Sequence, residues 1–130
     1  MPFDLQESLL AKAESALGAP LPSSYRSAML RSNGGELEVE GDTWVVYPIA
    51  DTSDRKRISR TANHILHETE RCRAWPRFPE GALAIASNGS GDQLVFIRSG
   101  AAFSPGVFLW SHETGALREV AHDFSELASA

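Results

Sequence analysis

Three side chains with acid–base or metal-binding chemistry lie in two predicted turns of the C-terminal half. His112 and Glu113 are adjacent in the segment 112–115, and Asp92 closes the glycine-containing segment 88–92. A histidine beside carboxylates could hold a metal ion or act as an acid–base pair. Neighbouring residues in one turn usually point apart, however, and no third ligand stands at a helpful spacing. The pattern therefore favours local hydrogen bonds that cap the turns, and we predict no catalytic residue, no metal and no cofactor.

Other reactive residue types stand in patterns that favour structural roles. His64, His67 and Glu68 follow an order different from the HExxH and HxxEH motifs of zinc proteases, so a solvated helix face is expected. Cys72 falls on the apolar side of the same predicted helix, which favours a small buried side chain. The segment 88–92 matches neither phosphate-binding glycine motif and is flanked by predicted strands, so it is expected to be a hairpin turn.

Acidic side chains are concentrated in one predicted hairpin. They are Glu36, Glu38, Glu40 and Asp42. The first three alternate with apolar residues, which predicts three carboxylates on one face of a strand, where like charges repel. Two interpretations remain open: a basic partner relieves the repulsion, or the charges protect an edge strand against aggregation.

Basic side chains are concentrated in the middle of the chain. Residues 54–80 hold seven basic and four acidic side chains, whereas both flanking segments are acidic. Lys56, Arg60 and Arg71 are predicted on the polar face of a helix over 54–73. They lack interleaved exposed aromatic residues, so nucleic-acid recognition is not favoured. A solvated face and a protein-docking face both remain open.

The composition is typical of one ordinary globular domain. The chain has 130 residues, of which 42% are apolar and 22% charged. Its net charge of −5 argues against nonspecific binding to nucleic acid or to an anionic membrane. A single cysteine permits no internal disulfide, and neither a leader peptide nor a membrane-spanning stretch is visible. We therefore expect a cytoplasmic protein.

The groups above must be positioned by a fold that the sequence pattern predicts as α+β. Helices are expected at about 5–17, 22–32, 54–73 and 124–128, and strands at 36–40, 43–47, 82–86, 93–97, 107–110 and 117–121. Asp4 is expected to cap the first helix and Gly18 to end it. Most links between strands are too short for parallel crossovers. We therefore predict a single domain over 1–130, with a largely antiparallel sheet flanked by helices.

Four stretches of sequence, taken in order, resemble the SUKH superfamily, a group typified by a fungal regulator of cell-wall synthesis. They are residues 17–25 with 32–35, residues 85–96 with Gly91 and Asp92, residues 107–113, and residues 120–127. The likeness covers about 5–128 and is weakest in the predicted helix 54–73. It implies an α+β fold, and it implies that bacterial members are immunity proteins that neutralise a toxin, often a nuclease. The family often carries an acid where this chain has Ser111, which leaves a carboxylate role there unsupported.

The resemblance and the charge pattern together predict a non-enzymatic immunity protein that binds and occludes a cognate protein toxin. The expected contacts are Glu36, Glu38, Glu40 and Asp42 as one patch, and Asp92, His112 and Glu113 as a second. Trp44 and Trp110 would anchor the partner if exposed, although burial of at least one is favoured. The alternatives are a regulatory protein-interaction module without a toxin partner and a small metal-dependent hydrolase that uses the second patch.

Overall fold

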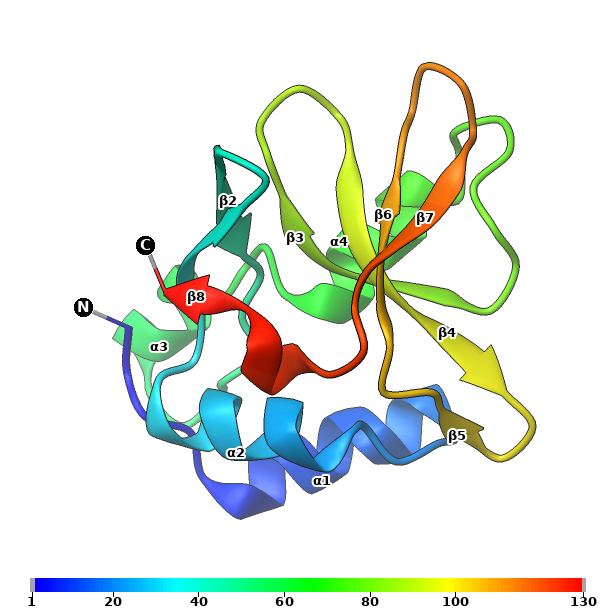
Figure 1. Cartoon of the computed structure of the whole chain (residues 1–130). Helices are drawn as coiled ribbons and strands as arrows, with labels where there is room; N and C mark the ends of the chain where they lie inside the picture. Colours follow the sequence, from blue (N-terminus) through cyan, green and yellow to red (C-terminus); the bar gives the residue numbers. More distant parts are fainter. Residues whose placement is uncertain (1, 130) are drawn as a thin grey trace.

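The computed structural model describes residues 2–129 as a curled antiparallel sheet with helices packed against it (Figure 1). The helices in this range are α1 (Glu7–Leu17), α2 (Ser23–Arg31), α3 (Arg55–Arg60), α4 (Ile65–Cys72) and the short 3-10 helix η1 (Phe124–Glu126). The strands are β1 (Gly35–Val39), β2 (Asp42–Val46), β3 (Ala82–Ser87), β4 (Gln93–Ser99), β5 (Ala102–Phe103), β6 (Val107–Trp110), β7 (Leu117–Ala121) and β8 (Ala128–Ser129). Within these residues, no helix combines the length and the apolar character needed to span a membrane.

The strand pairs of the described chain are all antiparallel. The main sheet has the order β7-β6-β4-β3-β2-β1-β8, and β5 pairs with the end of β4. Short connections join three of the neighbouring pairs, β1 with β2, β3 with β4 and β6 with β7, whereas α3 and α4 lie between β2 and β3 in the chain. The predicted α+β class with a largely antiparallel sheet is therefore confirmed, and each of the six expected strands is present.

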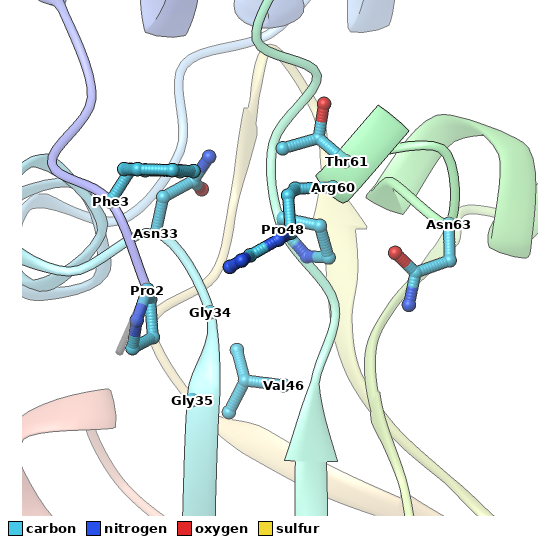
Figure 2. Close-up of a pocket in the computed structure, with 10 residues that line it drawn as sticks. All are labelled: Pro2, Phe3, Asn33, Gly34, Gly35, Val46, Pro48, Arg60, Thr61 and Asn63. Atoms are coloured by element: carbon cyan, nitrogen blue, oxygen red, sulfur yellow. The ribbon is translucent and has the colours of Figure 1, made fainter. Parts of the chain in front are cut away.

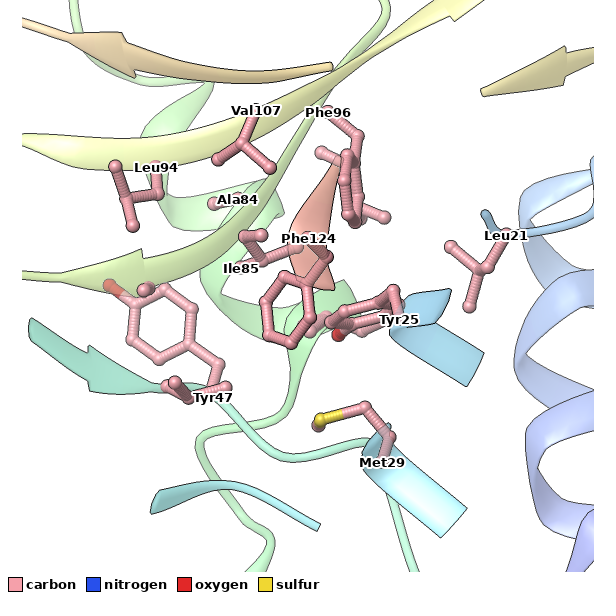
Figure 3. Packing of buried hydrophobic residues seen from close by; sticks show 14 of the residues in the cluster. Leu21, Tyr25, Met29, Tyr47, Ala84, Ile85, Leu94, Phe96, Val107 and Phe124 are labelled. Atoms are coloured by element: carbon pink, nitrogen blue, oxygen red, sulfur yellow. The ribbon is translucent and has the colours of Figure 1, made fainter. Parts of the chain in front are cut away.

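Both faces of the central strands are covered. Tyr25 of α2 is fully buried and meets the rings of Phe96 and Phe124 edge-on, with centroid distances of 5.0 and 5.1 Å (Figure 3). Edge-to-face ring contacts of this kind add to the free energy gained by burial. In Figure 1, α1 and α2 lie below the sheet and α4 lies behind it. There, Oγ1 of Thr69 accepts the backbone N–H of Ala84 at 2.9 Å, so α4 is fixed directly to β3.

The predicted helix over 54–73 is wrong as one continuous element. The hydroxyl of Thr61 donates to the carbonyl of Arg57 at 2.8 Å, where α3 ends. The Nδ1 atom of His64 accepts the backbone N–H of His67 at 3.2 Å and caps the start of α4. Side chains that bond to nearby backbone groups compete with helical hydrogen bonds, and these two bonds mark the end of α3 and the start of α4.

This break also changes the surface that the sequence predicted for the helix. Ile58, which the helical spacing of the apolar residues in 54–73 predicts on the same apolar side as Cys72, is 50% exposed. Lys56 and Arg60 lie on α3, whereas Arg71 lies on α4 and pairs with Glu68 of the same helix. The predicted single basic face is therefore wrong, because its members belong to two separate helices.

The two ends of the chain differ from the prediction in detail. Asp123 caps η1 as expected, but the predicted helix over 124–128 lasts only one turn before the chain extends as β8. β8 then pairs with β1. Gly18 ends α1 with a φ of 71°, as predicted. Asp4 does not cap α1, because Gln6 occupies the N-cap and the carboxylate of Asp4 binds Arg57 instead.

Candidate functional site

Three connections between strands gather at one end of the sheet. The register of β2 on β3 and of β4 on β6 places the turn 40–41, the loop 88–92 and the turn 111–116 at the same end. They lie along the upper side of the molecule in Figure 1. We call these three connections the loop end. The two patches predicted separately from the sequence therefore lie close to the same end of one sheet.

The acidic strand β1 alternates as the sequence predicted. Leu37 and Val39 are buried, whereas Glu36 and Glu38 are exposed on the opposite face. The hydroxyl of Thr43 donates to Oε2 of Glu38 at 3.4 Å. Within residues 2–129, neither Glu36 nor Glu38 has a basic side chain within ion-pair distance. These two carboxylates are therefore negative charges that the fold leaves unmatched.

Glu40 does not belong to this row, so the predicted face of three carboxylates is wrong at this position. It lies in the turn after β1 with a φ of 53°. Its carboxylate binds both terminal nitrogens of Arg118 on β7, at the far edge of the sheet, with 2.7 Å between Oε1 and Nη2. The hydrogen bond from Arg118 lowers the pKa of Glu40. Asp42, at the start of β2, is exposed and joins Glu36 and Glu38 as an unpaired acid in the described chain.

The alternative role of the acidic cluster was protection of an edge strand. β1 lies between β2 and β8 in the sheet, so it is not the outermost strand. β8 covers it at two positions, where Leu37 pairs with Ser129 and Glu38 pairs with Ala128. Protection by charge applies to a strand at the edge of a sheet. β1 is an edge strand only where β8 does not pair with it.

The second predicted patch is only partly assembled. Nδ1 of His112 lies 2.8 Å from Oδ1 of Asp92, and the backbone N–H of His112 donates to the same oxygen at 3.1 Å. Partial burial raises the pKa of Asp92, but hydrogen bonds from His112 and Asn88 outweigh this and lower it. Glu113 is exposed, and its backbone carbonyl accepts a hydrogen bond from Arg77 at 3.1 Å. No trio of His, Cys, Asp or Glu side chains suited to a metal ion occurs between residues 2 and 129.

The contact between Asp92 and His112 depends on the glycine beside it. Gly91 has a φ of 108°, in a region that side chains disfavour. A Cβ atom at this position would lie only 3.0 Å from the His112 ring. The loop 88–92 can therefore approach the turn 111–116 only because residue 91 has no side chain.

The two tryptophans that would anchor a partner if exposed are both buried. Trp44 is 1% exposed and Trp110 is 0% exposed, so the favoured burial is confirmed and neither side chain meets the condition for an anchor. The Nε1 atom of Trp110 donates to the carbonyl of Arg77 at 3.2 Å. The exposed tryptophan is Trp75, at 44%, and its ring centroid lies 5.3 Å from that of His112. Sequence reasoning did not identify this side chain at the loop end.

The basic helix α3 packs against the N-terminal segment. The Arg57 guanidinium contacts the carboxylate of Asp51 at 3.0 Å and that of Asp4 at 3.2 Å. It lies 4.5 Å from the ring centroid of Phe3, and the Arg60 guanidinium lies 5.5 Å from the same ring. Burial raises the pKa of Asp51, but its hydrogen bonds, including the one from Arg57, lower it more. The charges in this region therefore connect parts of the fold.

A pocket of about 300 Å³ opens beside this contact (Figure 2). Arg60 supplies a charged side chain to its lining, together with Thr61 and Asn33. The Asn33 amide bonds the backbone of Ile49 in both directions, at 2.8 Å each, and the Thr61 hydroxyl is bonded to α3. The Asn33 and Thr61 side chains are thus engaged by the fold, and no set of reactive groups converges among the lining residues.

The remaining predicted motifs have structural roles. Cys72 is buried, which raises its pKa to about 11 and confirms the small buried side chain expected from its position. The segment 88–92 joins β3 to β4 as the predicted hairpin connection, and Oδ1 of Asn88 accepts the backbone N–H of Ser90 at 3.1 Å. His67 is exposed on α4, as expected for a solvated face, but Glu68 beside it is buried, so the predicted solvated face is wrong at Glu68.

Comparison with known proteins gives one family match. The sequence model of the SMI1 / KNR4 family (SUKH-1) matches residues 5–129. No curated protein matches the chain. The matched range contains every helix and strand from α1 to β8, and so includes the whole loop end.

Proposed function

Because the chain belongs to the SMI1 / KNR4 family (SUKH-1), we propose that it is an immunity protein that binds a cognate bacterial toxin and neutralises it by occlusion. The proposed contact surface is the loop end together with the outward face of β1 and β2. The observation that carries the proposal is a group of carboxylates without basic partners in the described chain, placed on paired strands beside the exposed apolar side chain of Val45. These carboxylates are Glu36, Glu38 and Asp42.

Electrostatic complementarity is the first argument for a basic partner. Two exposed carboxylates two residues apart on one strand face repel each other, and a cation between them relieves that repulsion. A toxin that acts on nucleic acid must carry a basic surface to approach its substrate. An acidic inhibitor then gains rapid, salt-sensitive association with this surface and covers it in the complex.

The same surface also offers apolar contact area. Val45 is 48% exposed and stands directly opposite Glu36 in the pairing of β1 with β2. Trp75, beside the loop end, is 44% exposed. Aromatic residues supply much of the binding energy in protein complexes, while surrounding charges set orientation and association rate. The proposed surface therefore combines an anchor with an acidic steering field.

Co-expression with the toxin encoded next to this protein tests the proposal. Wild-type protein should restore growth of cells that make the toxin. The double variant Glu36→Lys, Glu38→Lys should rescue poorly, and its affinity for the toxin should fall by about tenfold or more, because attraction becomes repulsion. Growth curves and calorimetry of the purified pair measure the two effects.

Glu80→Lys is the matched control for charge. Glu80 is also exposed but precedes β3, at the opposite end of the sheet from the loop end. It should leave rescue and affinity unchanged. Equal rescue by the wild type and the double variant would remove the acidic hairpin from the contact surface, and a wild-type protein that neither binds nor rescues would overturn the immunity function itself.

A further inference from the structure

A pocket of about 330 Å³ lies at the side of the loop end, between α4 and the loop 88–92. Its lining includes Glu68 and Arg71 of α4, Trp75, and the polar residues Tyr47 and Gln93. This volume is near the lower end of the range for small-molecule pockets, about 300 Å³. It suits one inserted side chain better than a larger organic ligand.

Glu68 brings a negative charge into this pocket. Its side chain is only 12% exposed, whereas its ion-pair partner Arg71 is 67% exposed. The Nη1 atom of Arg71 lies 3.3 and 3.5 Å from the two carboxylate oxygens, which is long for a charge-assisted hydrogen bond. The Nε2 atom of His67, also on the exposed side of α4, lies 4.0 Å from Oε2 of the same carboxylate. A largely buried carboxylate whose partners are exposed and distant can accept a better one.

The other walls favour a planar cation. Trp75 lines the pocket and is 44% exposed as a whole residue, and indole rings attract guanidinium groups through their faces. The hydroxyl of Tyr47 donates to Oε1 of Gln93 at 2.9 Å, which fixes both side chains in the wall. Burial is the main cause that raises the pKa of the neighbouring Cys72 thiol; the Glu68 charge raises it further and Arg71 lowers it.

We propose that this pocket receives an arginine side chain of the bound protein, with the guanidinium on the Glu68 carboxylate and against the Trp75 indole. Arginine fits better than lysine because its planar fork can bind both carboxylate oxygens and stack on an aromatic ring at the same time. Arg71 occupies the carboxylate in the free protein and moves into solvent when the partner's arginine enters. The proposal rests on the proposed function in taking the partner to be a basic protein.

The pocket can be tested without any partner by titrating ¹⁵N-labelled protein with N-acetyl-arginine N-methylamide. We expect saturable shifts of the Trp75 indole N–H and of the backbone amides of Ser87 and Gly91. The Trp75 signal is assigned as the indole peak missing from Trp75→Phe. The citrulline analogue, which has the same shape without the charge, should bind at least about tenfold more weakly.

Two substitutions on α4 should change the affinity for the arginine probe in opposite directions. Glu68→Gln should weaken arginine binding by about tenfold, whereas Arg71→Ala should strengthen it because the internal competitor is gone. Glu70→Gln is the matched control, since Glu70 is exposed on the same helix and its ion pair is with Arg73. Equal binding of the arginine and citrulline probes, or weaker binding by Arg71→Ala, would overturn the proposal.

Failure of this inference is distinguishable from failure of the proposed function. Toxin rescue that depends on Glu36 and Glu38, in a protein whose pocket does not prefer arginine, refutes the pocket alone. Selective arginine binding that disappears in Glu68→Gln, in a protein that rescues no toxin, supports the pocket and refutes the immunity role. In both cases the spectrum of each variant must keep the signal dispersion of the wild type, which shows that the fold is intact.

Discussion

Charged side chains have different roles in two regions of the molecule. The first region is the contact of α3 with the N-terminal segment, and the second is the hairpin of β1 and β2. At α3, Arg57 connects Asp51 to Asp4, so opposite charges from separate segments are matched. On the hairpin, Glu36 and Glu38 face outward, and the described chain places no basic side chain within ion-pair distance of them. Both regions are rich in charge, but Arg57 is matched by carboxylates of the fold, whereas Glu36 and Glu38 have no basic partner in the described chain.

This difference separates charge that supports the fold from charge that is available to a partner. The carboxylate of Asp51 is 1% exposed and would be unfavourable without its partners. The acids on β1 are exposed, repel each other, and give the fold no ion pair. We therefore expect substitutions in the two regions to affect different measurements, stability in the first and association in the second.

The largest effect on stability is expected at Asp51. Asp51→Ala removes the carboxylate that accepts hydrogen bonds from Ser53 and Arg57, and should lower the free energy of unfolding by about 2 kcal/mol. Urea unfolding followed by circular dichroism measures the loss. Glu38→Ala is the comparison, and it should stay within about 0.5 kcal/mol of the wild type. Equal losses in the two variants would abolish the distinction between the regions.

The rate of association with the toxin should depend on the acids of β1, which contribute little to stability. The variant Glu36→Lys, Glu38→Lys should bind the toxin about tenfold more slowly at low salt, because the steering field is reversed. Its unfolding midpoint should stay close to that of the wild type. Stopped-flow measurements across a salt series would also show a weaker dependence on ionic strength. A variant that associates normally but unfolds early would place these acids with the structural charges.

A smaller, pH-dependent effect is expected at Asp92, the matched acid of the loop end. Its pKa is lowered in the fold, so its contribution is present above the pKa of the unfolded chain, about 3.9, and is lost as pH falls through the folded value. The stability difference between wild type and Asp92→Asn should therefore be largest above about pH 4 and shrink in stronger acid. A difference that grows as pH falls would contradict the lowered pKa.

The smallest effect is expected from Arg118→Ala. The pair that Arg118 forms with Glu40 is exposed, and exposed ion pairs contribute little to stability. The melting temperature should not change measurably, but the turn at Gly41 should exchange its amide hydrogen faster. Hydrogen exchange followed by NMR detects this local change. A marked fall in melting temperature would show that the loop end, like α3, uses its charges to hold the fold.

Parts of the fold that depend on residues adjacent in sequence could be predicted, whereas parts that depend on distant residues could not. The hairpin of β1 and β2 could be predicted because alternation and a glycine turn are properties of adjacent residues. The break after α3 could not, because the amide of Ile65 donates to the carbonyl of Pro48 and Thr61 bonds the amide of Asp51. The helical spacing of apolar residues does not reveal such contacts with an earlier segment.

In the candidate site, too, features set by neighbouring residues could be predicted and features set by distant residues could not. Exposure of Glu36 and Glu38 follows from strand alternation, whereas the contact of Glu40 with Arg118 joins residues 78 positions apart. The contact depends on the curl of the whole sheet. Likewise, the sequence does not show which of the three tryptophans is exposed. Trp75 lies on the surface with its ring against Trp110 of β6, and this packing depends on the folded structure. The one local signal was the proline that follows Trp75 and ends the helical path.

The unequal burial of the tryptophans supplies the protein with an intrinsic optical reporter. Iodide and acrylamide should quench the fluorescence of Trp75, at 44% exposure, far more than that of Trp44 and Trp110, at 1% and 0%. A macromolecule seated over the loop end would shield that emission and shift it to the blue. Occupancy of this surface can therefore be followed in the unmodified protein, with no dye attached.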